Sequence, residues 1–489
     1  MDFELLTPAE MTEVDRASAA EGVPGAALME RAGEAVAHAA LDYAAEKIVV
    51  LAGPGANGGD GFVAARLLAE ANRAVVVAVL GDRAALRGDA AQAAAGWAGP
   101  TVRLEDADFA RVDLIIDALF GAGLSRPLSG AAADAVLAAQ ACGAPIIAVD
   151  TPSGLDGASG HPIGDVCMRA DVTVTFVRLK PGHILLPGRL LCGRIVLADI
   201  GAPASAVASV GARVWLNRPA VWRDAIPEPS IAGHKYSRGH VAVWSGPELQ
   251  TGASRLSALA ALRAGAGAVT LLGSKAALKE HAAHLTAIML REAEDGWRSF
   301  LDQRKVAAVV VGPGASATPD TRRALEEACA GDRRVVMDAD VFSLFAGDAE
   351  GLGRLIGEGE AVLTPHEGEF KRVFGEDADV APSKLERARA AAARVGATIV
   401  LKGPDTVVAS QDGRATIADN APPHLATAGA GDVLAGLIAG LMAQGAPVFE
   451  AASAAVWLHG EAANAIGRGL IADDLPGALP NVLQSLASQ

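Results

Sequence analysis

The chain of 489 residues is poor in cysteine and lacks long apolar runs. Its four cysteines form no CxxC pair, so the spacing of a thiolate metal site or redox centre is absent and buried free thiols are expected. Its longest apolar runs, such as Val433–Ala443, are much shorter than the ~20 residues of a membrane-spanning helix. The N-terminal sequence MDFELLTPAE lacks a signal-peptide pattern. We therefore expect a cytoplasmic protein without a membrane partner.

The chain also has few aromatic residues and no excess of positive charge. Only 4% of the residues are aromatic whereas 51% are hydrophobic, with much alanine and glycine, which favours close-packed helices on Val/Ile-rich strands, an α/β fold. The formal net charge of −15 argues against nonspecific binding to nucleic acid. It does not exclude an anionic small ligand, which needs only a local group of cations and backbone N–H donors.

The length predicts more than one domain. Prolines and charges gather between residues 203 and 233, between two stretches that each alternate strand, loop and helix. We place the junction near Ala225–Ile231, which predicts domains at residues 1–224 and 225–489. The two halves show no convincing sequence repeat, so two unrelated α/β domains are expected.

The first half carries polar residues directly after several apolar runs. KIVVLAGPGANGGDG reads as a strand to about Ala52, a glycine loop and then a helix, and two further strands are predicted to end near Asp117 and Asp150. Thr7 is expected to cap an earlier helix, with Glu10 completing a capping box. Because ligands bind beyond the carboxyl ends of parallel strands, these loops predict one site.

Taken alone, the loop GPGANGGDG is ambiguous. It is neither a GxGxxG dinucleotide fingerprint nor a P-loop, and a plain tight turn explains it as well as a ligand loop does. Asp117 and Asp150 have the alternative of capping a helix or turn. The oxygen atoms of Asn57, Asp117 and Ser153 would suit a hard cation.

Four motifs in order, GPGANGGDGFVAARLL, DALFGAGLSRPLSG, VDTPSGLDGASG and VTFVRLKPGHILLPG, resemble the epimerase domain of the NAD(P)H-hydrate repair enzymes over residues 5–210. The resemblance implies a Rossmann-like three-layer αβα domain and potassium bound by Asn57, Asp117 and Ser153. The family loop has Asn where this chain has Ala56. Asp150 is the candidate proton-moving group, with Lys180 as its electrostatic partner. The residues implied to bind the hydrated nucleotide are Ala56, Asn57, Gly58, Gly59, Asp60, Gly121, Ala122, Gly123, Leu124, Ser125, Arg126, Pro127 and Asp150.

In the second half, TAGAGDVLAG combines small residues, an acid and the start of an apolar helix. Gly429 and Gly431 let backbone N–H groups face an anion, and the helix adds its positive N-terminal end. The same dipole is expected to make Asp432 easier to ionise, so that it could accept a proton from an attacking hydroxyl. The alternative is a helix cap that follows a turn.

Further segments, among them MDADVF, TPHEGEF, VLKGPDTVV and NAPPHLATAGAGDVLAG, resemble the ribokinase-like fold, and most closely its NAD(P)H-hydrate dehydratase branch, over residues 225–487. The resemblance implies a three-layer αβα domain in which Glu369 organises magnesium-bound water and Asp432 is the base. Family members read Gly-Gly-Thr-Gly-Asp before the helix, whereas this chain has Ala428 and Ala430. The residues implied to contact the hydrate are Ala253, Gly314, His366 and Asp432, and those implied to hold the adenine nucleotide are Lys402, Gly403, Pro404, Asp405, Thr406 and Gly431.

Together the resemblances imply a bifunctional enzyme that epimerises hydrated NADH and NADPH and dehydrates the S form, with ADP as phosphoryl donor, K⁺ and Mg²⁺ as cofactors, and a homo-oligomeric assembly. Two alternatives remain at this stage. The second half would fit a true ribokinase-like kinase for an alcohol such as a vitamin precursor. The first half would fit a nucleotide-binding module that has lost catalysis, although Asn57, Asp60, Asp117 and Asp150 argue against that.

Overall fold

The computed structural model describes residues 3–228, 230–293, 296–375 and 383–487. Its contacts divide the chain into two compact units, Asp2–Val214 and Trp215–Gln489. The boundary precedes the predicted junction because strand β8 (Val214–Leu216) is the edge strand of the second sheet and Trp222 is buried in the second core. The sequence-based boundary at residue 225 was therefore placed too late. The Pro-rich stretch 203–233 therefore spans the start of the second unit, with most of it inside that unit.

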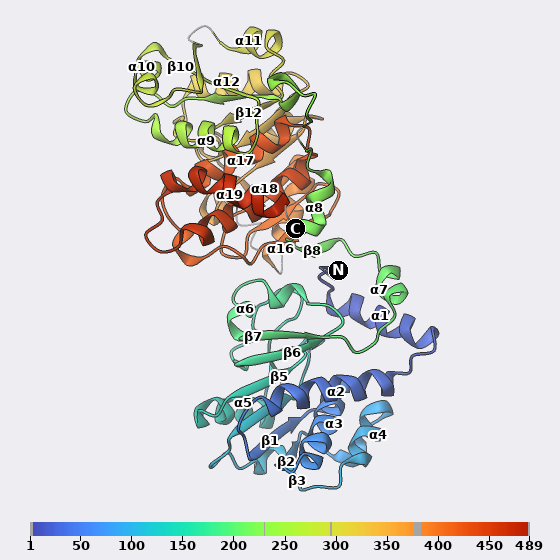
Figure 1. Ribbon diagram of the computed structural model, residues 1–489. Coiled ribbons are helices and arrows are strands. Elements are labelled where there is room, and N and C mark those ends of the chain that lie inside the picture. Colours follow the sequence, from blue (N-terminus) through green and yellow to red (C-terminus); the bar gives the residue numbers. More distant parts are fainter. Residues whose placement is uncertain (1–2, 229, 294–295, 376–382, 488–489) are drawn as a thin grey trace. The chain divides into compact units, whose positions relative to one another are not determined.

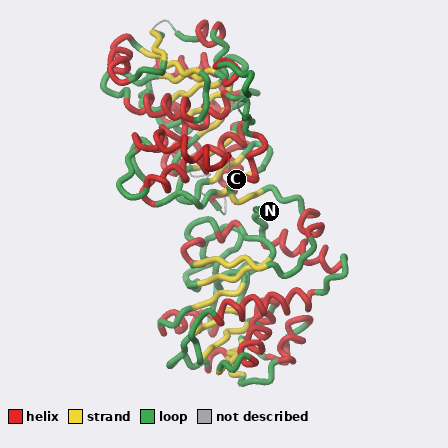
Figure 2. The backbone as a smooth tube through the Cα atoms, viewed as in Figure 1, coloured by secondary structure: helices red, strands yellow, loops and turns green. Residues whose placement is uncertain are grey.

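The first unit is built on a sheet of seven parallel strands in the order β3-β2-β1-β4-β5-β6-β7 (Figures 1 and 2). The strands are β1 (Lys47–Ala52), β2 (Ala74–Val79), β3 (Thr101–Arg103), β4 (Leu114–Ala118), β5 (Ile146–Val149), β6 (Val172–Phe176) and β7 (Arg194–Ala198). The helices are α1 (Pro8–Ala20), α2 (Gly25–Leu41), α3 (Ala56–Glu70), α4 (Gly88–Gly96), α5 (Ala131–Cys142), α6 (Gly188–Leu191) and α7 (Ala204–Ser209). The chain adds β2 and β3 on one side of β1 and then β4 to β7 on the other, so the order of the strands changes direction between β1 and β4.

Side chains that alternate between the two faces of each strand give this unit its three layers. Ile48 and Val50 of β1 belong to one core cluster together with residues of α2 and α3, whereas Val49 and Leu51 belong to another that contains residues of α5. Because successive side chains of a strand point to opposite faces, the helices cover both faces of the sheet. The predicted αβα class and the strand ends near Ala52, Asp117 and Asp150 are confirmed. The capping box of Thr7 and Glu10 is also present.

The glycine loop differs from the prediction. Helix α3 already begins at Ala56, so the segment from Asn57 to Gly61 forms its first turns. Its glycines fit here because the helix lies against other groups: an added Cβ on Gly58 would be 1.9 Å from the carbonyl oxygen of Gly53. Close packing offsets the low helix propensity of glycine. Asp60 is therefore held on a helix rather than on a loop.

The second unit contains a ten-stranded sheet in the order β11-β10-β9-β12-β13-β14-β15-β16-β17-β8. Besides the edge strand β8, the strands of this sheet are β9 (His240–Trp244), β10 (Ala268–Gly273), β11 (Met289–Glu292), β12 (Ala308–Val311), β13 (Arg334–Met337), β14 (Ala361–Leu363), β15 (Thr398–Leu401), β16 (Val407–Ala409) and β17 (Ala415–Ile417). Pairing is parallel from β11 to β15, and β16 is antiparallel to both β15 and β17. Strands β12, β13, β14 and β15 lie in the apolar runs VAAVVV, RRVVM, AVL and ATIVL, as the expected alternation of strand, loop and helix requires.

Helices cover this sheet too (Figure 1). They are α8 (Pro219–Trp222), α9 (Gly252–Arg263), α10 (Lys275–His284), α11 (Arg298–Gln303), α12 (Pro319–Cys329), α13 (Asp340–Leu344), α14 (Ala349–Ile356), α15 (Glu367–Phe374), α16 (Lys384–Val395), α17 (Ala430–Ala443), α18 (Val448–Ile466) and α19 (Leu475–Ala487). Helix α17 packs against α9 so closely that a Cβ on Gly436 would lie 2.1 Å from the carbonyl oxygen of Ser257. The small residues of VLAGLIAGLMA thus serve helix packing.

Two sequence-based expectations about the whole chain can be compared with the structure. Among the helices of the described residues, none is long and apolar enough to cross a membrane. The four cysteines are free thiols, but only Cys192 is buried and Cys142 is exposed, so the expectation of uniformly buried thiols was wrong.

Candidate active sites

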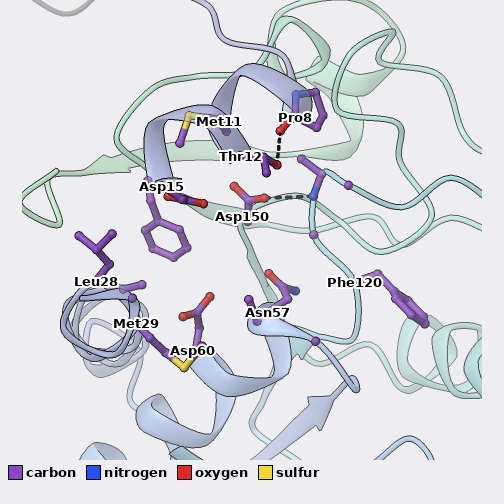
Figure 3. A pocket seen from close by; sticks show the side chains of 18 of the residues that line it. Pro8, Met11, Thr12, Asp15, Leu28, Met29, Asn57, Asp60, Phe120 and Asp150 are labelled. Atoms are coloured by element: carbon purple, nitrogen blue, oxygen red, sulfur yellow. Dashed lines mark hydrogen bonds between the residues drawn. The ribbon is translucent and has the colours of Figure 1, made fainter. Parts of the chain in front are cut away.

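A cavity of about 830 Å³ lies at the carboxyl ends of β1, β4 and β5 in the first unit (Figure 3). Helices α1 and α2 close its other side through apolar residues that include Met11, Leu28 and Met29. Its position at the β1/β4 reversal is the place where open parallel sheets bind ligands. The predicted nucleotide-binding residues that line it are Ala56, Asn57, Asp60, Gly121, Ala122, Gly123, Leu124, Ser125, Arg126 and Asp150.

Three predicted residues do not line this cavity. Gly58 and Gly59 are buried within α3, where they face Gly53 and Met29 respectively. Pro127 instead lines an adjacent cavity of about 550 Å³. The glycines of the motif therefore let the helix approach the strand loop, and the polar residues on either side of them face the cavity.

Asp150 directly follows β5, and both oxygens of its carboxylate accept hydrogen bonds from other residues of the chain. Its Oδ1 accepts hydrogen bonds from Lys180 Nζ at 2.6 Å and Thr175 Oγ1 at 3.0 Å, and its Oδ2 accepts one from the Ala122 N–H at 3.0 Å. Burial opposes ionisation, but the Lys180 ammonium and these hydrogen bonds lower the pKa of Asp150 to about 2. The predicted partnership with Lys180 is present. A carboxylate with this pKa is a weak base, so its surroundings disfavour the proton-moving role expected for Asp150.

Asp117 and Ser153 lie behind the cavity and contact each other. Asp117 Oδ1 accepts from Ser153 Oγ at 2.7 Å and Oδ2 accepts from the Ser153 N–H at 2.8 Å. Burial raises the pKa of Asp117 to about 6 despite these hydrogen bonds. No cation of the described residues pairs with this carboxylate. The Nδ2 of Asn57 is buried without a hydrogen-bond partner, but it is a donor, so only the Oδ1 of this side chain could bind a cation. An oxygen-rich donor set with an uncompensated negative charge fits a cation such as potassium.

Asp60 shows the opposite electrostatic state to Asp150. Its side chain comes from α3, is 8% exposed and points into the cavity (Figure 3). Burial raises the pKa of Asp60 well above its usual range, and the charges of Asp150 and Asp15 raise it further. Sequence reasoning placed Asp60 at the substrate but did not foresee its ionisation state. It also missed Asp15, because α1 carries no motif beyond its capping box.

In the second unit, helix α17 begins at the rim formed by the carboxyl ends of the parallel strands. Gly429 precedes the helix with a left-handed φ of 89°, the conformation that glycine allows. Gly431 leaves room for a cation: an added Cβ would lie 3.1 Å from Lys402 Nζ. The helix N-terminus, the small residues and Lys402 together make a surface suited to a phosphate.

Carboxylates surround Lys402. Its Nζ donates to Asp338 Oδ1 at 2.9 Å and lies 3.7 Å from Glu369 Oε2. Burial raises the pKa of Asp432 to about 7, and Asp338 adds to the effect, whereas Lys402 opposes it. The expectation that the helix dipole makes Asp432 easier to ionise was therefore wrong, because burial and neighbouring negative charges dominate. A carboxyl group with a pKa near 7 is well suited to accept a proton at neutral pH.

The segment TPHEGEF forms a capping box at the start of α15. His366 Nδ1 accepts from the N–H groups of Gly368 at 3.0 Å and Glu369 at 3.2 Å, and Glu369 Oε2 accepts from the His366 N–H at 2.8 Å. Histidine thus performs the capping for which Asn is commonly used. This geometry explains why His and Glu stand three residues apart. It also holds the Glu369 carboxylate near Lys402.

A largely apolar cavity of about 540 Å³ adjoins the α17 N-terminus. It is lined by the predicted residues His366, Lys402, Gly403, Pro404, Thr406 and Gly431. Asp405 is instead buried against Lys384, whose Nζ lies 2.6 Å from its Oδ1. Ala253 and Gly314 do not line this cavity but lie together, since a Cβ on Gly314 would be 3.1 Å from that of Ala253.

Sequence reasoning missed Asp338, Lys384 and His459 in this unit. MDADVF was recognised as a motif, but nothing in it distinguished Asp338 from its neighbours. Lys384, which pairs with Asp405, comes from α16. His459, which lines the cavity, comes from α18. Among the described residues, no group of three or more His, Cys, Asp or Glu side chains is arranged to hold a metal by itself. The carboxylates in excess over Lys402 instead fit a divalent ion that arrives with nucleotide phosphates.

Fold and sites thus define a two-domain α/β enzyme that acts on nucleotides. A family model described as NAD(P)H-hydrate dehydratase matches residues 241–481, and one described as YjeF-related protein N-terminus matches residues 25–182. The bifunctional NAD(P)H-hydrate repair enzyme of Moorella thermoacetica is 36% identical over 520 residues, which cover 99% of this chain and 97% of that protein. That of Gloeobacter violaceus is 37% identical and covers 94% and 92%. The chain belongs to the family of bifunctional NAD(P)H-hydrate repair enzymes.

Solved structures are similar to part of this chain. The ADP/ATP-dependent NAD(P)H-hydrate dehydratase of Bacillus subtilis, co-crystallised with ATP and Mg²⁺, is 27% identical with a TM-score of 0.47 and covers 55% of this chain and 98% of that one. A ribokinase-like superfamily protein of Enterococcus faecalis is 23% identical with a TM-score of 0.49, and covers 57% and 97%.

Proposed function

We propose that the first unit interconverts the R and S epimers of hydrated NADH and NADPH, and that the second unit dehydrates the S epimer at the expense of ADP. Family membership supports both activities. The observation that carries the second is the position of Asp432, at a helix N-terminus beside Lys402 and with a pKa near 7. The true-kinase and binding-module alternatives lose their support, because both family models match within one chain.

In the second unit, the C6 hydroxyl of the hydrate would give its proton to Asp432 while its oxygen attacks the β-phosphorus of ADP and AMP leaves. The resulting phosphate ester then loses inorganic phosphate as the ring nitrogen supplies its electron pair. Loss of a proton from C5 restores the dihydronicotinamide. Phosphate is a far better leaving group than hydroxide, which is why phosphoryl transfer serves a dehydration. Lys402 and the α17 N–H groups would stabilise the negative charge that develops on the phosphoryl oxygens.

The remaining residues have binding roles in this proposal. The nucleotide would occupy the cavity beside Lys402–Thr406 and Gly431, with Ala253, Gly314 and His366 against the hydrate. Mg²⁺ would be held through water by Glu369 and would neutralise phosphate charge when bound. The substrates are small molecules, whereas a homo-oligomeric assembly and a cytoplasmic location stay predictions.

In the first unit, Asn57, Asp117 and Ser153 would hold potassium. The hydrate would bind in the cavity between Ala56–Asp60 and the loop Gly121–Pro127. Asp150 would act there as a fixed anion, since its carboxylate is hydrogen-bonded on both oxygens.

The test of the whole proposal uses the purified full chain, an R/S mixture of NADH hydrate, Mg²⁺ and ADP. Absorbance of the dihydronicotinamide should return for the whole mixture, with one AMP and one phosphate per NADH formed. Recovery of only the S fraction would refute the proposed epimerase activity. No recovery with either ADP or ATP would refute the dehydratase half.

A further inference from the structure

Two of the aspartates that line the cavity of the first unit, Asp150 and Asp60, are in opposite ionisation states. Asp150 is ion-paired with Lys180 and hydrogen-bonded through both oxygens. Asp60 is more than nine-tenths buried, points into the same space, and makes no side-chain hydrogen bond or ion pair with any described residue (Figure 3). Two titratable groups whose surroundings push their ionisation apart commonly divide acid and charge-stabilising roles.

We propose that Asp60 is the proton donor and acceptor of the epimerisation, and that Asp150 is the fixed anion that stabilises the cationic ring. This inference rests on the epimerase activity proposed above. It assigns the proton transfer to a residue that otherwise has only a binding role, and it leaves Asp150 at the substrate.

The chemistry balances as follows. Asp60 protonates the C6 hydroxyl, the C6–O bond breaks with its electron pair going to oxygen, and water leaves. The lone pair of the ring nitrogen forms a double bond to C6, so the ring carries one positive charge next to the Asp150 carboxylate. Water adds to the opposite face of C6 and releases one proton, which returns to the Asp60 carboxylate through water in the cavity. No oxidant, reductant or nucleotide is consumed.

The protonated state of Asp60 has a physical cause. Desolvation disfavours its ionised form, and the charges of Asp150 and Asp15 do the same. Lys180 is paired with Asp150 rather than with Asp60. The charged groups that line the same cavity are Asp15 and Arg16 of α1, Asp89 of α4, Arg126 after β4, Asp150 after β5 and Lys180 after β6.

The experiment follows the conversion of purified R hydrate to S by chromatography, with Asp60→Asn and Asp60→Glu compared with the wild type. We expect Asp60→Asn to lose at least ~100-fold in kcat with little change in KM, because general acid–base catalysis contributes about that much. Asp60→Glu should recover part of the rate. In H₂¹⁸O the wild-type S product should carry ¹⁸O at C6.

The outcomes separate the inference from the function on which it rests. An inactive wild type would refute the epimerase proposal itself. An active wild type with an undiminished Asp60→Asn rate, or an S product without ¹⁸O, would overturn only the role of Asp60 or the C–O cleavage. Because Asn removes a buried carboxyl without changing its size, the variant should keep the wild-type melting temperature or exceed it, and that measurement identifies a folding defect.

A different observation, the adjacent cavity of about 550 Å³, carries a second inference. It shares Phe120, Leu124 and Arg126 with the first cavity and extends along the end of β2, where Leu80, Asp82 and Leu86 line it. In sheets of this strand order a dinucleotide lies across the point where the order reverses, with an acid at the end of the second strand binding ribose hydroxyls. One oxygen of Asp82 accepts from the Ala84 N–H.

We infer that this second cavity takes the adenosine half of the hydrated dinucleotide, with Asp82 accepting hydrogen bonds from its ribose. A 2′-phosphate would bring negative charge to Asp82, so the epimerase should favour NADH hydrate over NADPH hydrate. The probe is the ratio of kcat/KM for the two purified R hydrates. We expect at least ~10-fold preference in the wild type, about 1.4 kcal/mol, and a clear decrease in Asp82→Asn.

The matched control is Asp108→Asn, because exposed Asp108 makes the same hydrogen bond to an N–H two residues on and lines neither cavity. It should leave the ratio unchanged. Equal use of both hydrates by the wild type, or a preference that survives Asp82→Asn, would overturn the assignment. A wild type that epimerises neither hydrate would instead refute the proposed function.

Discussion

Lys402 Nζ lies 2.9 Å from Asp338 Oδ1, with the Asp338 side chain 2% exposed, and it is the only cation within ion-pair distance of that carboxylate among the described residues. The pair joins the end of β15 to the end of β13 and places a positive charge beside Gly431. We therefore expect Lys402 to have a structural role as the partner of Asp338 in addition to the phosphate-binding role proposed above. The two roles can be separated by mutation.

Lys402→Met should destabilise the second unit, because it leaves Asp338 buried and unpaired. The expected loss is about 3–5 kcal/mol in the free energy of unfolding, measured by urea denaturation. The double variant Lys402→Met/Asp338→Asn should recover most of this stability. Neither variant should bind ADP like the wild type in calorimetry. Wild-type stability of Lys402→Met would contradict the buried-pair interpretation.

Asp432→Asn should keep nucleotide binding but lose dehydration. The amide has nearly the same shape as the carboxyl, so the ADP dissociation constant should change little, whereas kcat should fall by at least ~100-fold without the base. The assay is NADH formation from S hydrate with saturating ADP. Glu367→Gln is a suitable control, since Glu367 is exposed and pairs with Arg387 on the surface. Undiminished turnover in Asp432→Asn would refute the role as base.

The pKa of Asp432 also predicts how stability changes with pH. Its folded-state pKa of about 7 exceeds the ordinary value of 3.8, so the folded protein retains a proton that the unfolded chain releases. The contribution of Asp432 to stability thus falls as pH rises from about 4 to 7, and the cost is complete above pH 7. Asp432→Asn should therefore stabilise the protein by ~2–4 kcal/mol at pH 8 but little at pH 4. A constant difference across this range would contradict the raised pKa.

The sequence predicted the strands well because their signal is local. Runs such as VVLA, LIID and TIVL are long enough, and end sharply enough in Gly, Pro or Asp, to mark parallel strands and the rim where loops meet. The start of α3 was not predictable in the same way. GANGGDG has low helix propensity, and its helical state depends on contacts with Gly53 and Met29, which lie on other elements.

The sequence could name candidate site residues where a motif contained them, as for His366, Glu369 and Asp432. Their ionisation was not predictable, because it depends on neighbours brought together by the fold. Asp432 lies in the first turn of α17, at the positive end of the helix, but burial and then the charge of Asp338 raise its pKa. The pairing of Asp150 with Lys180 was expected, but nothing near Asp150 in the sequence shows that Thr175 and the Ala122 N–H also occupy its carboxylate.

Gly429 offers a test of backbone conformation at the proposed phosphate site. Its φ of 89° disfavours any side chain, and an added Cβ would lie 2.9 Å from Ala472 Cβ and from Leu256 Cδ1. Gly467 has a similar φ of 83° but open space around it. Gly467→Ala should cost about 1 kcal/mol, and Gly429→Ala should cost clearly more and also raise the KM for ADP. Equal melting temperatures of the two variants would show that α17 tolerates a shift at its start.

Potassium binding in the first unit is testable without activity. Asp117 is fully buried and no described residue supplies it with a positive charge, so a bound cation should stabilise the folded state over the unfolded one. The wild-type melting temperature should rise with KCl more than with choline chloride at the same ionic strength. Asp117→Asn should lose this difference, because the amide no longer supplies the negative charge that attracts the ion, whereas exposed Asp108→Asn should keep it. A wild type whose melting temperature is the same in both salts would show that the Asp117 carboxylate needs no ion. Its raised pKa of about 6 would then mean that the group is protonated in part near neutral pH, and that Asn57 and Ser153 serve the loop after β4 rather than a metal.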